Sequence, residues 1–387
     1  NRLSLGRLCF FLTWAILFSY LLLGEVLIKL SIDMPYVGAF LLLLLLFFTL
    51  VMMIARLSFV YDDISMLQLL LLIYFPVVVA FNIHDSKFFF GNYLPFLTSF
   101  IVFSSIQNNP CFYRKHYISI IEKFTRGFAI ILSVQIAFQS GIFSNQYNEG
   151  FILGLGGGNT IGFYLLMLFF VIYHTKKNKL DISILVLLFL SMLLTSSRGT
   201  LLSFIVVFIA MQPPARRLIF FVFLLVAVLF SFDPVVFSKL TNILPFLSSG
   251  SNDDVTSGRL IIYMSAYETI LDNFFYGIGF GNFIIPDLAS FNFDKIWRPH
   301  NILLEIQLSG GIIATILFLM IVLIFYLRML PNINKDPLVK GIFFGVTAAL
   351  LQGMLTPTIF SYKIDSFFWF YIGVAMVLCR KQRSIRS

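Results

Sequence analysis

The sequence predicts an all-α integral membrane protein with about 12 transmembrane helices and one large external region between the ninth and tenth helices. Apolar residues make up 59% of the 387-residue chain and charged residues only 12%, whereas soluble domains carry about 25% charged residues. Apolar runs recur at lengths close to the roughly 20 residues that span a bilayer. Lys and Arg gather in alternate connections between these runs, a bias typical of membrane proteins.

The apolar runs form a single membrane domain, residues 1–387, in which we find no strong internal repeat and no domain boundary. The first run has no small-residue cleavage site after it, so we expect a retained helix. The runs at 93–107 and 199–212 are short for a bilayer, and we expect flanking residues to lengthen them. The predicted spans lie near residues 8–30, 36–55, 65–83, 93–107, 127–143, 159–174, 181–196, 199–212, 217–232, 301–327, 340–356 and 365–379.

The distribution of Lys and Arg sets the orientation of these spans. If both termini are cytoplasmic, 19 of the 27 basic residues lie on the cytoplasmic side and 8 on the external side. This bias explains the formal charge of +9 without nucleic acid as a partner. The three Cys residues have no ligand spacing, so neither a disulfide framework nor a Cys-bound metal is expected.

The large external region covers residues 233–299 and is the longest polar connection in the chain. Connections of this length are usually functional or disordered. Within it, Ile262, Ala266 and Ile270 recur at helical spacing and predict an amphipathic helix over residues 260–275. Thr256 or Ser257 is expected to cap its N-terminus. This helix is a candidate lid over a site at the membrane surface.

Three arginines and one histidine fall on the predicted external face. They are Arg198, Arg259, Arg298 and His300. A guanidinium group binds phosphate through two parallel hydrogen bonds, and the pKa of a histidine suits a general base near neutral pH. The alternatives are an arginine that reaches the interface to end a helix and a histidine that anchors a helix end. No Asp-x-Asp pair or histidine cluster on this face predicts a metal site.

Other residues near these cations complete the candidate site. Gly277, Gly279 and Asn282 lie in a glycine-rich stretch that permits tight turns and close approach to a ligand. The alternative is a turn that re-enters the membrane surface. Asn301 and Glu305 have the i,i+4 spacing of one helix face. Glu305 is therefore expected to orient Asn301 or to contact substrate, because ionisable groups within membrane spans mark functional sites by default.

These motifs resemble the O-antigen ligase and polymerase superfamily of bacterial envelope glycosyltransferases. The matching elements are Ser197-Arg198-Gly199, Gly258-Arg259, the segment 277–283, His300-Asn301 with Leu304-Glu305, and Gly310-Gly311. The resemblance covers roughly residues 150–330. It implies inverting glycan transfer from undecaprenyl diphosphate, without metal or other cofactor, at the periplasmic face of the inner membrane. It also implies that Arg198 and Arg259 bind the donor diphosphate and that His300 activates the acceptor hydroxyl.

Two branches of this superfamily fit the sequence. A polymerase transfers a growing chain to a lipid-linked repeat unit, whereas a ligase transfers finished polysaccharide to lipid A–core. In the ligase pattern, His is followed by Asn, Ser or Gln, then nine residues, Gly, two residues, and Gly, Thr or Tyr. Here Gly311 fits, but Ala314 stands at the last position and Thr315 follows it. The polymerase is therefore preferred.

The polymerase interpretation implies an undecaprenyl-diphosphate-linked oligosaccharide as substrate, contact with membrane lipid and a chain-length regulator protein as a partner. Arg298, Asn301, Glu305, Gly279 and Asn282 are the expected substrate-binding residues. The alternative from another class is a transporter of lipid-linked oligosaccharide. Transporters often have repeated halves and charged groups deep in the bilayer, and neither is evident in this sequence.

Overall fold

The computed structural model describes residues 6–15, 47, 62–81, 86–113, 115–139, 158–195, 197–213, 259–279, 299, 301–355 and 364–384. Within these ranges every regular element is a helix, which agrees with the predicted all-α class. Residues 6–15 are helical, and the helices with described bounds are α4 (Asp63–Phe81), α5 (Ser86–Asn108), α6 (Lys115–Gln139), α7 (Gly158–Thr175), α8 (Lys179–Leu194), α9 (Arg198–Ala210), α12 (Arg259–Asp272), α13 (Ile302–Met329), α14 (Pro337–Gly353) and α15 (Ile364–Ser384), with short 3₁₀ turns at Pro110–Tyr113 and Leu330–Asn332.

Helix α7 lies inside the bundle, and all of its residues from 161 to 172 are buried. It packs mainly against α14, where Gly341 and Gly345 face Val171 and Met167. A Cβ atom at Gly341 would lie 2.7 Å from the Cα of Val171, so a larger side chain would force the helices apart. Small residues allow such close backbone approach between membrane helices. Helices α7 and α14 therefore pack closely against each other, and α9 contacts both of them.

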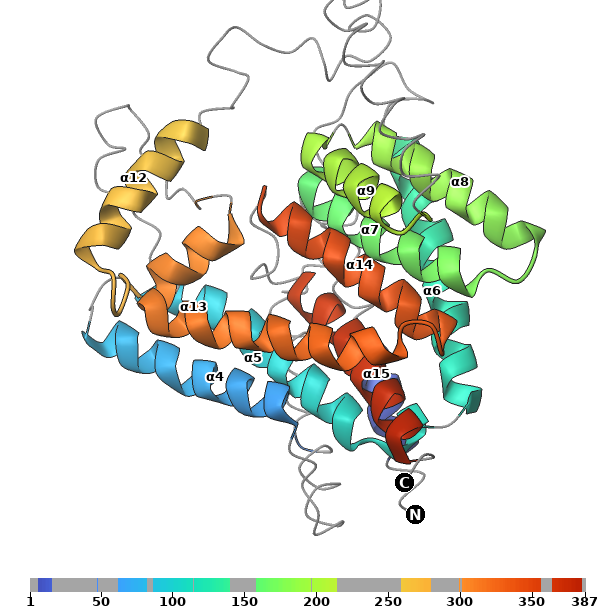
Figure 1. Ribbon diagram of the computed structural model, residues 1–387, viewed down its shortest axis with the longest axis horizontal. Coiled ribbons are helices and arrows are strands. Elements are labelled where there is room, and N and C mark those ends of the chain that lie inside the picture. The colour runs from blue at the N-terminus through green and yellow to red at the C-terminus, as the bar shows by residue number, and fades with distance from the viewer. Residues whose placement is uncertain are drawn as a thin grey trace, which may run out of the picture.

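The remaining long helices pair around this centre. Helix α13 runs beside α4, and α15 packs against α5 (Figure 1). Aromatic rings fill the space between α6, α7 and α15, as in the contact of Tyr164 with Phe367 at 4.9 Å between ring centroids. Apolar side chains on the outer sides of α4 and α13, such as Ile73 and Leu323, are exposed. An apolar outer surface is what a lipid environment requires of a helix bundle.

Each predicted span that the structure describes overlaps a helix, but α6 begins at Lys115, well before the run 127–143, and α13 is interrupted at Gly310 and Gly311. The short run 93–107 lies within the 23-residue α5, which begins at Ser86, whereas α9 has only 13 residues. By length and apolar composition, Asp63–Ala80 and Ile302–Asn332 qualify as membrane spans among the described residues. The runs 217–232 and, apart from Phe47, 36–55 lie outside them. The number 12 therefore stays a prediction.

Charged side chains gather at one end of the bundle. Arg328 Nη1 lies 2.5 Å from Asp62 Oδ1, and Arg380 Nη2 lies 2.9 Å from Asp62 Oδ2. At the same end, Arg126 Nε lies 2.6 Å from Asp181 Oδ1. These arginines all belong to the set that the sequence assigns to the cytoplasmic side. Their gathering agrees with that partition, while the side of the membrane that this end faces stays a prediction.

Candidate active site

Arg198 is the first residue of α9, at the end of the bundle opposite the charged layer. Ser197 precedes the helix as its N-cap, and its Oγ accepts a hydrogen bond from Thr200 N at 3.3 Å. Ser197 and Thr200 are buried, whereas Arg198 is exposed. A helix N-terminus attracts phosphate through its backbone N–H groups and its dipole. The local structure therefore places a guanidinium group beside a backbone that also favours an anion.

A buried hydrogen-bond chain fixes this helix start to its neighbours. Thr200 Oγ1 donates to Ser197 Oγ at 2.7 Å, and Gln352 Nε2 of α14 donates to Thr200 Oγ1 at 2.9 Å. Thr200 also fills the space beside Gly162 of α7, where an added Cβ atom would overlap the threonine side chain. Gln352 and Thr200 have no exposed surface. The position of Arg198 therefore depends on contacts of α9 with both α7 and α14.

The second feature is a break in α13 at Gly310 and Gly311. Their φ/ψ angles are −150/18° and 63/−161°, so the helix is interrupted between two regular segments. Gln307 and Thr315 bridge the break, since Thr315 Oγ1 donates to Gln307 Oε1 at 2.6 Å. Tyr74 of α4 donates to the carbonyl oxygen of Gly310 at 3.0 Å. Non-helical backbone at membrane depth is tolerated only where other groups satisfy it.

The turn after α12 supplies the missing backbone partners. In a continuous helix the N–H of Ile312 would bond to the carbonyl of Leu308. Here Ile312 N donates to Phe274 O at 2.9 Å, and Leu308 O accepts from Ile278 N at 2.7 Å. Gln307 Nε2 also donates to Phe274 O at 3.0 Å, which is the third hydrogen bond between this turn and α13. One helical hydrogen bond is thus replaced by bonds that join two segments distant in the sequence.

Two glycines make this close approach possible. Gly277 has φ 68°, and a Cβ atom there would lie 2.7 Å from Gly311 N. Gly311 has φ 63°, and its Cβ atom would lie 2.5 Å from Tyr276 N. Gly279, predicted to bind substrate, is buried with φ 100°. The glycine-rich stretch therefore does permit close backbone approach, and the approach observed at Gly277 is to α13.

The amphipathic helix predicted over residues 260–275 is confirmed as α12. Ile262, Ala266 and Ile270 are buried, as their spacing predicts, and pack against Leu308 of α13. In Figure 1, α12 lies at an angle beside the broken end of α13. Because the turn that follows α12 is bonded to α13, this end is fixed, and any lid motion must involve its N-terminal end. The expected caps, Thr256 and Ser257, lie outside the described residues.

Asn301 and Glu305 lie at the start of α13. Asn301 has non-helical angles and is the N-cap, with Oδ1 accepting from Leu303 N at 2.9 Å and from Leu304 N at 3.3 Å. It therefore precedes the helix instead of sharing a helix face with Glu305, and its side-chain oxygen serves as the cap. Glu305 is 1% exposed. Its burial suits a positioning role better than direct contact with a sugar.

The structure brings some predicted residues together and leaves others undescribed. It joins Gly277 and Gly279 to the start of α13, which carries Asn301 and Glu305. It describes Arg259 only as the first residue of α12, without its side chain. Asn282, Arg298 and His300 lie outside the described residues. The proposed proximity of the three arginines is therefore untested.

Sequence reasoning missed the polar groups that hold this end together. Gln307, Thr315, Tyr74, Thr200 and Gln352 each stand in a strongly apolar run, and each makes a hydrogen bond between helices or across a break. The available signal was their polarity, since a polar group within a span needs a partner. Within the described part of the chain, no group of three or more His, Cys, Asp or Glu residues could hold a metal ion.

Comparison with known proteins adds one match. Among curated proteins, none matches the chain. Residues 183–319, about a third of the chain, match the family model of O-antigen ligase. This segment runs from within α8 to about two thirds of the way along α13 and contains Arg198, Arg259, His300 and the break at Gly310. The apolar helices and this match are both consistent with a membrane protein, and the match supports a relationship to the ligase and polymerase superfamily.

Proposed function

We propose that the protein is a membrane glycosyltransferase that polymerises O-antigen repeat units at the periplasmic face of the inner membrane. The observation that carries the proposal is the O-antigen ligase family match over the segment that holds Arg198, Arg259 and His300. The exposed Arg198 at a capped helix start supports it, because that arrangement suits a phosphate group. The donor is undecaprenyl diphosphate bearing the growing glycan, and the acceptor is a lipid-linked repeat unit.

In the proposed reaction, an acceptor hydroxyl attacks the anomeric carbon of the donor sugar from the side opposite the diphosphate. A new C–O bond forms, the bond to the diphosphate breaks with inversion, and the proton passes to His300. Arg198 and Arg259 stabilise the negative charge on the leaving diphosphate. Loss of one such preorganised donor typically costs about 10² to 10³ in rate, and loss of general-base assistance about 10² to 10⁴.

The remaining predicted residues have supporting roles in this proposal. Arg298 adds positive charge beside His300, and Asn282 and Gly279 border the sugar. Asn301 donates its amide N–H to a sugar hydroxyl, since its carbonyl oxygen already caps α13. Glu305 positions the first turns of α13 from the buried side. No metal takes part in the proposed mechanism.

A ligase is the second candidate, and the description of the matching family favours it. Against it, Ala314 stands where the ligase pattern has Gly, Thr or Tyr. The two reactions differ in the acceptor. Purified protein supplied with lipid-linked repeat units alone would make lipid-linked polymer if it is a polymerase. Product only after addition of lipid A–core would overturn the polymerase assignment in favour of a ligase.

The residues are tested in the same assay with Arg198→Ala, Arg259→Ala and His300→Ala. We expect each variant to lose long-chain product by about 10²-fold or more at equal protein level. Lys179→Ala is the matched control, because this exposed cation lies at the opposite end of the bundle. Normal product from all three variants would contradict the proposed chemistry. Translocation of the lipid without any new linkage would instead indicate a transporter.

A further inference from the structure

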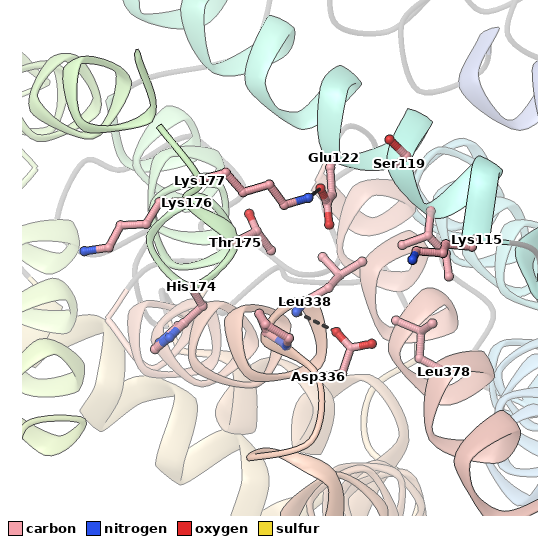
Figure 2. A pocket seen from close by; sticks show the side chains of 12 residues that line it. Lys115, Ser119, Glu122, His174, Thr175, Lys176, Lys177, Asp336, Leu338 and Leu378 are labelled. Carbon is pink, nitrogen blue, oxygen red and sulfur yellow. Dashed lines mark hydrogen bonds and ion pairs between the residues drawn. The ribbon is translucent and has the colours of Figure 1, made fainter. Parts of the chain in front are cut away.

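A cavity of about 630 Å³ opens at the charged end of the bundle, opposite Arg198. It lies between the first half of α6, the turn from α7 to α8, the start of α14 and the last turns of α15 (Figure 2). Its volume is within the range of about 300 to 1,000 Å³ that is common for small-molecule sites. Nothing in the proposed glycan transfer uses it.

The depth of the cavity places it where lipid headgroups lie. The apolar span Ile302–Asn332 ends just before Asp336, which lines the cavity. Leu378, another lining residue, is two residues from Arg380 in the layer of ion pairs. Charged layers at the ends of apolar helices mark the membrane interface, and basic pockets between helices on the cytoplasmic side bind phosphate headgroups.

The cavity carries both signs of charge on an apolar floor. Lys115 extends from α6 toward its middle, and Lys177 Nζ reaches across to Glu122 Oε2 at 2.5 Å (Figure 2). Asp336 accepts at Oδ1 from Leu338 N at 2.8 Å, so its carboxylate is held in place as the cap of α14. Leu338 and Leu378 supply part of the apolar lining.

We propose that this cavity binds a phospholipid headgroup that carries both a phosphodiester and a primary ammonium. Lys115, with Lys177, contacts the phosphate, and Asp336 contacts the ammonium. Glu122 is already paired with Lys177, whereas the carboxylate of Asp336, held as the cap of α14, would repel a purely anionic headgroup and attract the ammonium of a zwitterionic one. This site is independent of Arg198 and His300.

The test uses the full chain in detergent, with dihexanoyl phosphatidylethanolamine, phosphatidylglycerol and phosphatidylcholine as probes and retained lipid measured by native mass spectrometry. Wild-type protein should bind the ethanolamine lipid most tightly, because the quaternary ammonium of the choline lipid has no N–H donor. Lys115→Ala should weaken binding of all three by about tenfold, the effect of one lost charge-assisted hydrogen bond. Lys123→Ala, an exposed lysine one residue from Glu122 that does not line the cavity, should leave binding unchanged.

Asp336→Asn tests the negative charge of residue 336 separately from its role as the N-cap of α14. Asn is as good an N-cap as Asp, so α14 keeps its start while the cavity loses a carboxylate. This variant should lose the preference for ethanolamine and bind phosphatidylglycerol at least as well as the wild type does. Equal wild-type affinity for the three lipids, or equal effects of Lys115→Ala and Lys123→Ala, would overturn the proposal. Soluble phosphoethanolamine that competes at the same concentration would overturn the assignment to a lipid.

Discussion

Replacement of Gly311 by alanine should release the turn after α12 from α13. An L-residue at φ 63° and ψ −161°, a region adopted essentially by Gly alone, costs about 1 to 3 kcal/mol, and forcing a methyl group against the backbone of Phe275 and Tyr276 costs about 1 to 3 kcal/mol more. Alanine also favours a continuous helix, in which Ile312 N returns to Leu308 O. The docked turn is then destabilised by about 2 to 6 kcal/mol, which corresponds to at least a thirtyfold rise in its open population.

Hydrogen exchange of the purified protein in detergent measures this opening. Amides between Tyr263 and Ile278 should lose protection in Gly311→Ala, whereas amides of α7 should not. Gly127→Ala is the matched control, since a Cβ atom at Gly127 meets no other atom within 4 Å. Under the proposed function, Gly311→Ala should also lower polymer yield, because α12 carries Arg259. Wild-type protection from Tyr263 to Ile278 in Gly311→Ala would refute the reasoning.

Substitutions at three further positions test the supports of the candidate site and of the bundle. Gln352→Leu removes the hydrogen bond to Thr200 that helps to hold Arg198 in position. We therefore expect weaker binding of the glycan-carrying lipid diphosphate, read as a raised KM with kcat largely kept, in the purified polymer assay. Asn301→Ala should cost about 1 kcal/mol of unfolding free energy in chemical denaturation, whereas Asn301→Ser, which retains a cap, should cost only a few tenths. Asp181→Asn leaves Arg126 beside a neutral amide in a largely buried pair and should cost about 3 kcal/mol in the same assay; a loss below 1 kcal/mol would contradict this account of the charged layer.

The helices could be predicted from the length of local apolar runs, and the inner face of α12 from local periodicity. Ile262, Ala266 and Ile270 repeat at helical spacing, and burial of such a stripe needs no knowledge of its partner. The break in α13 could not be predicted, because Gly310 and Gly311 alone do not say whether a helix bends, breaks or continues. What decides it is a turn more than 30 residues earlier, whose Phe274 and Ile278 take the backbone bonds. Such contacts are not encoded in local pattern.

The surroundings of Arg198 show a second limit on what the sequence can predict. Arg198 could be singled out from its charge at a span boundary, but its support by Gln352 arises from a contact 152 residues away. A single Gln in an apolar helix signals that a partner exists without naming it. Motif order, by contrast, indicated the superfamily from the sequence, because the spacing of His300 and Gly311 is written in the chain itself.

The departure from the ligase pattern at Ala314 gives a last prediction. Ala314 has no exposed surface. A Cβ atom added at Gly310 would lie 2.6 Å from the Cβ atom of Ala314. The hydroxyl that bridges the break belongs to Thr315 and donates to Gln307. Ala314→Thr combined with Thr315→Ala restores the ligase-like residue but crowds Gly310 and removes this bond. We therefore expect lower polymer yield and weaker protection of the docked turn, without transfer to lipid A–core. Efficient transfer to lipid A–core would show instead that this position selects the acceptor.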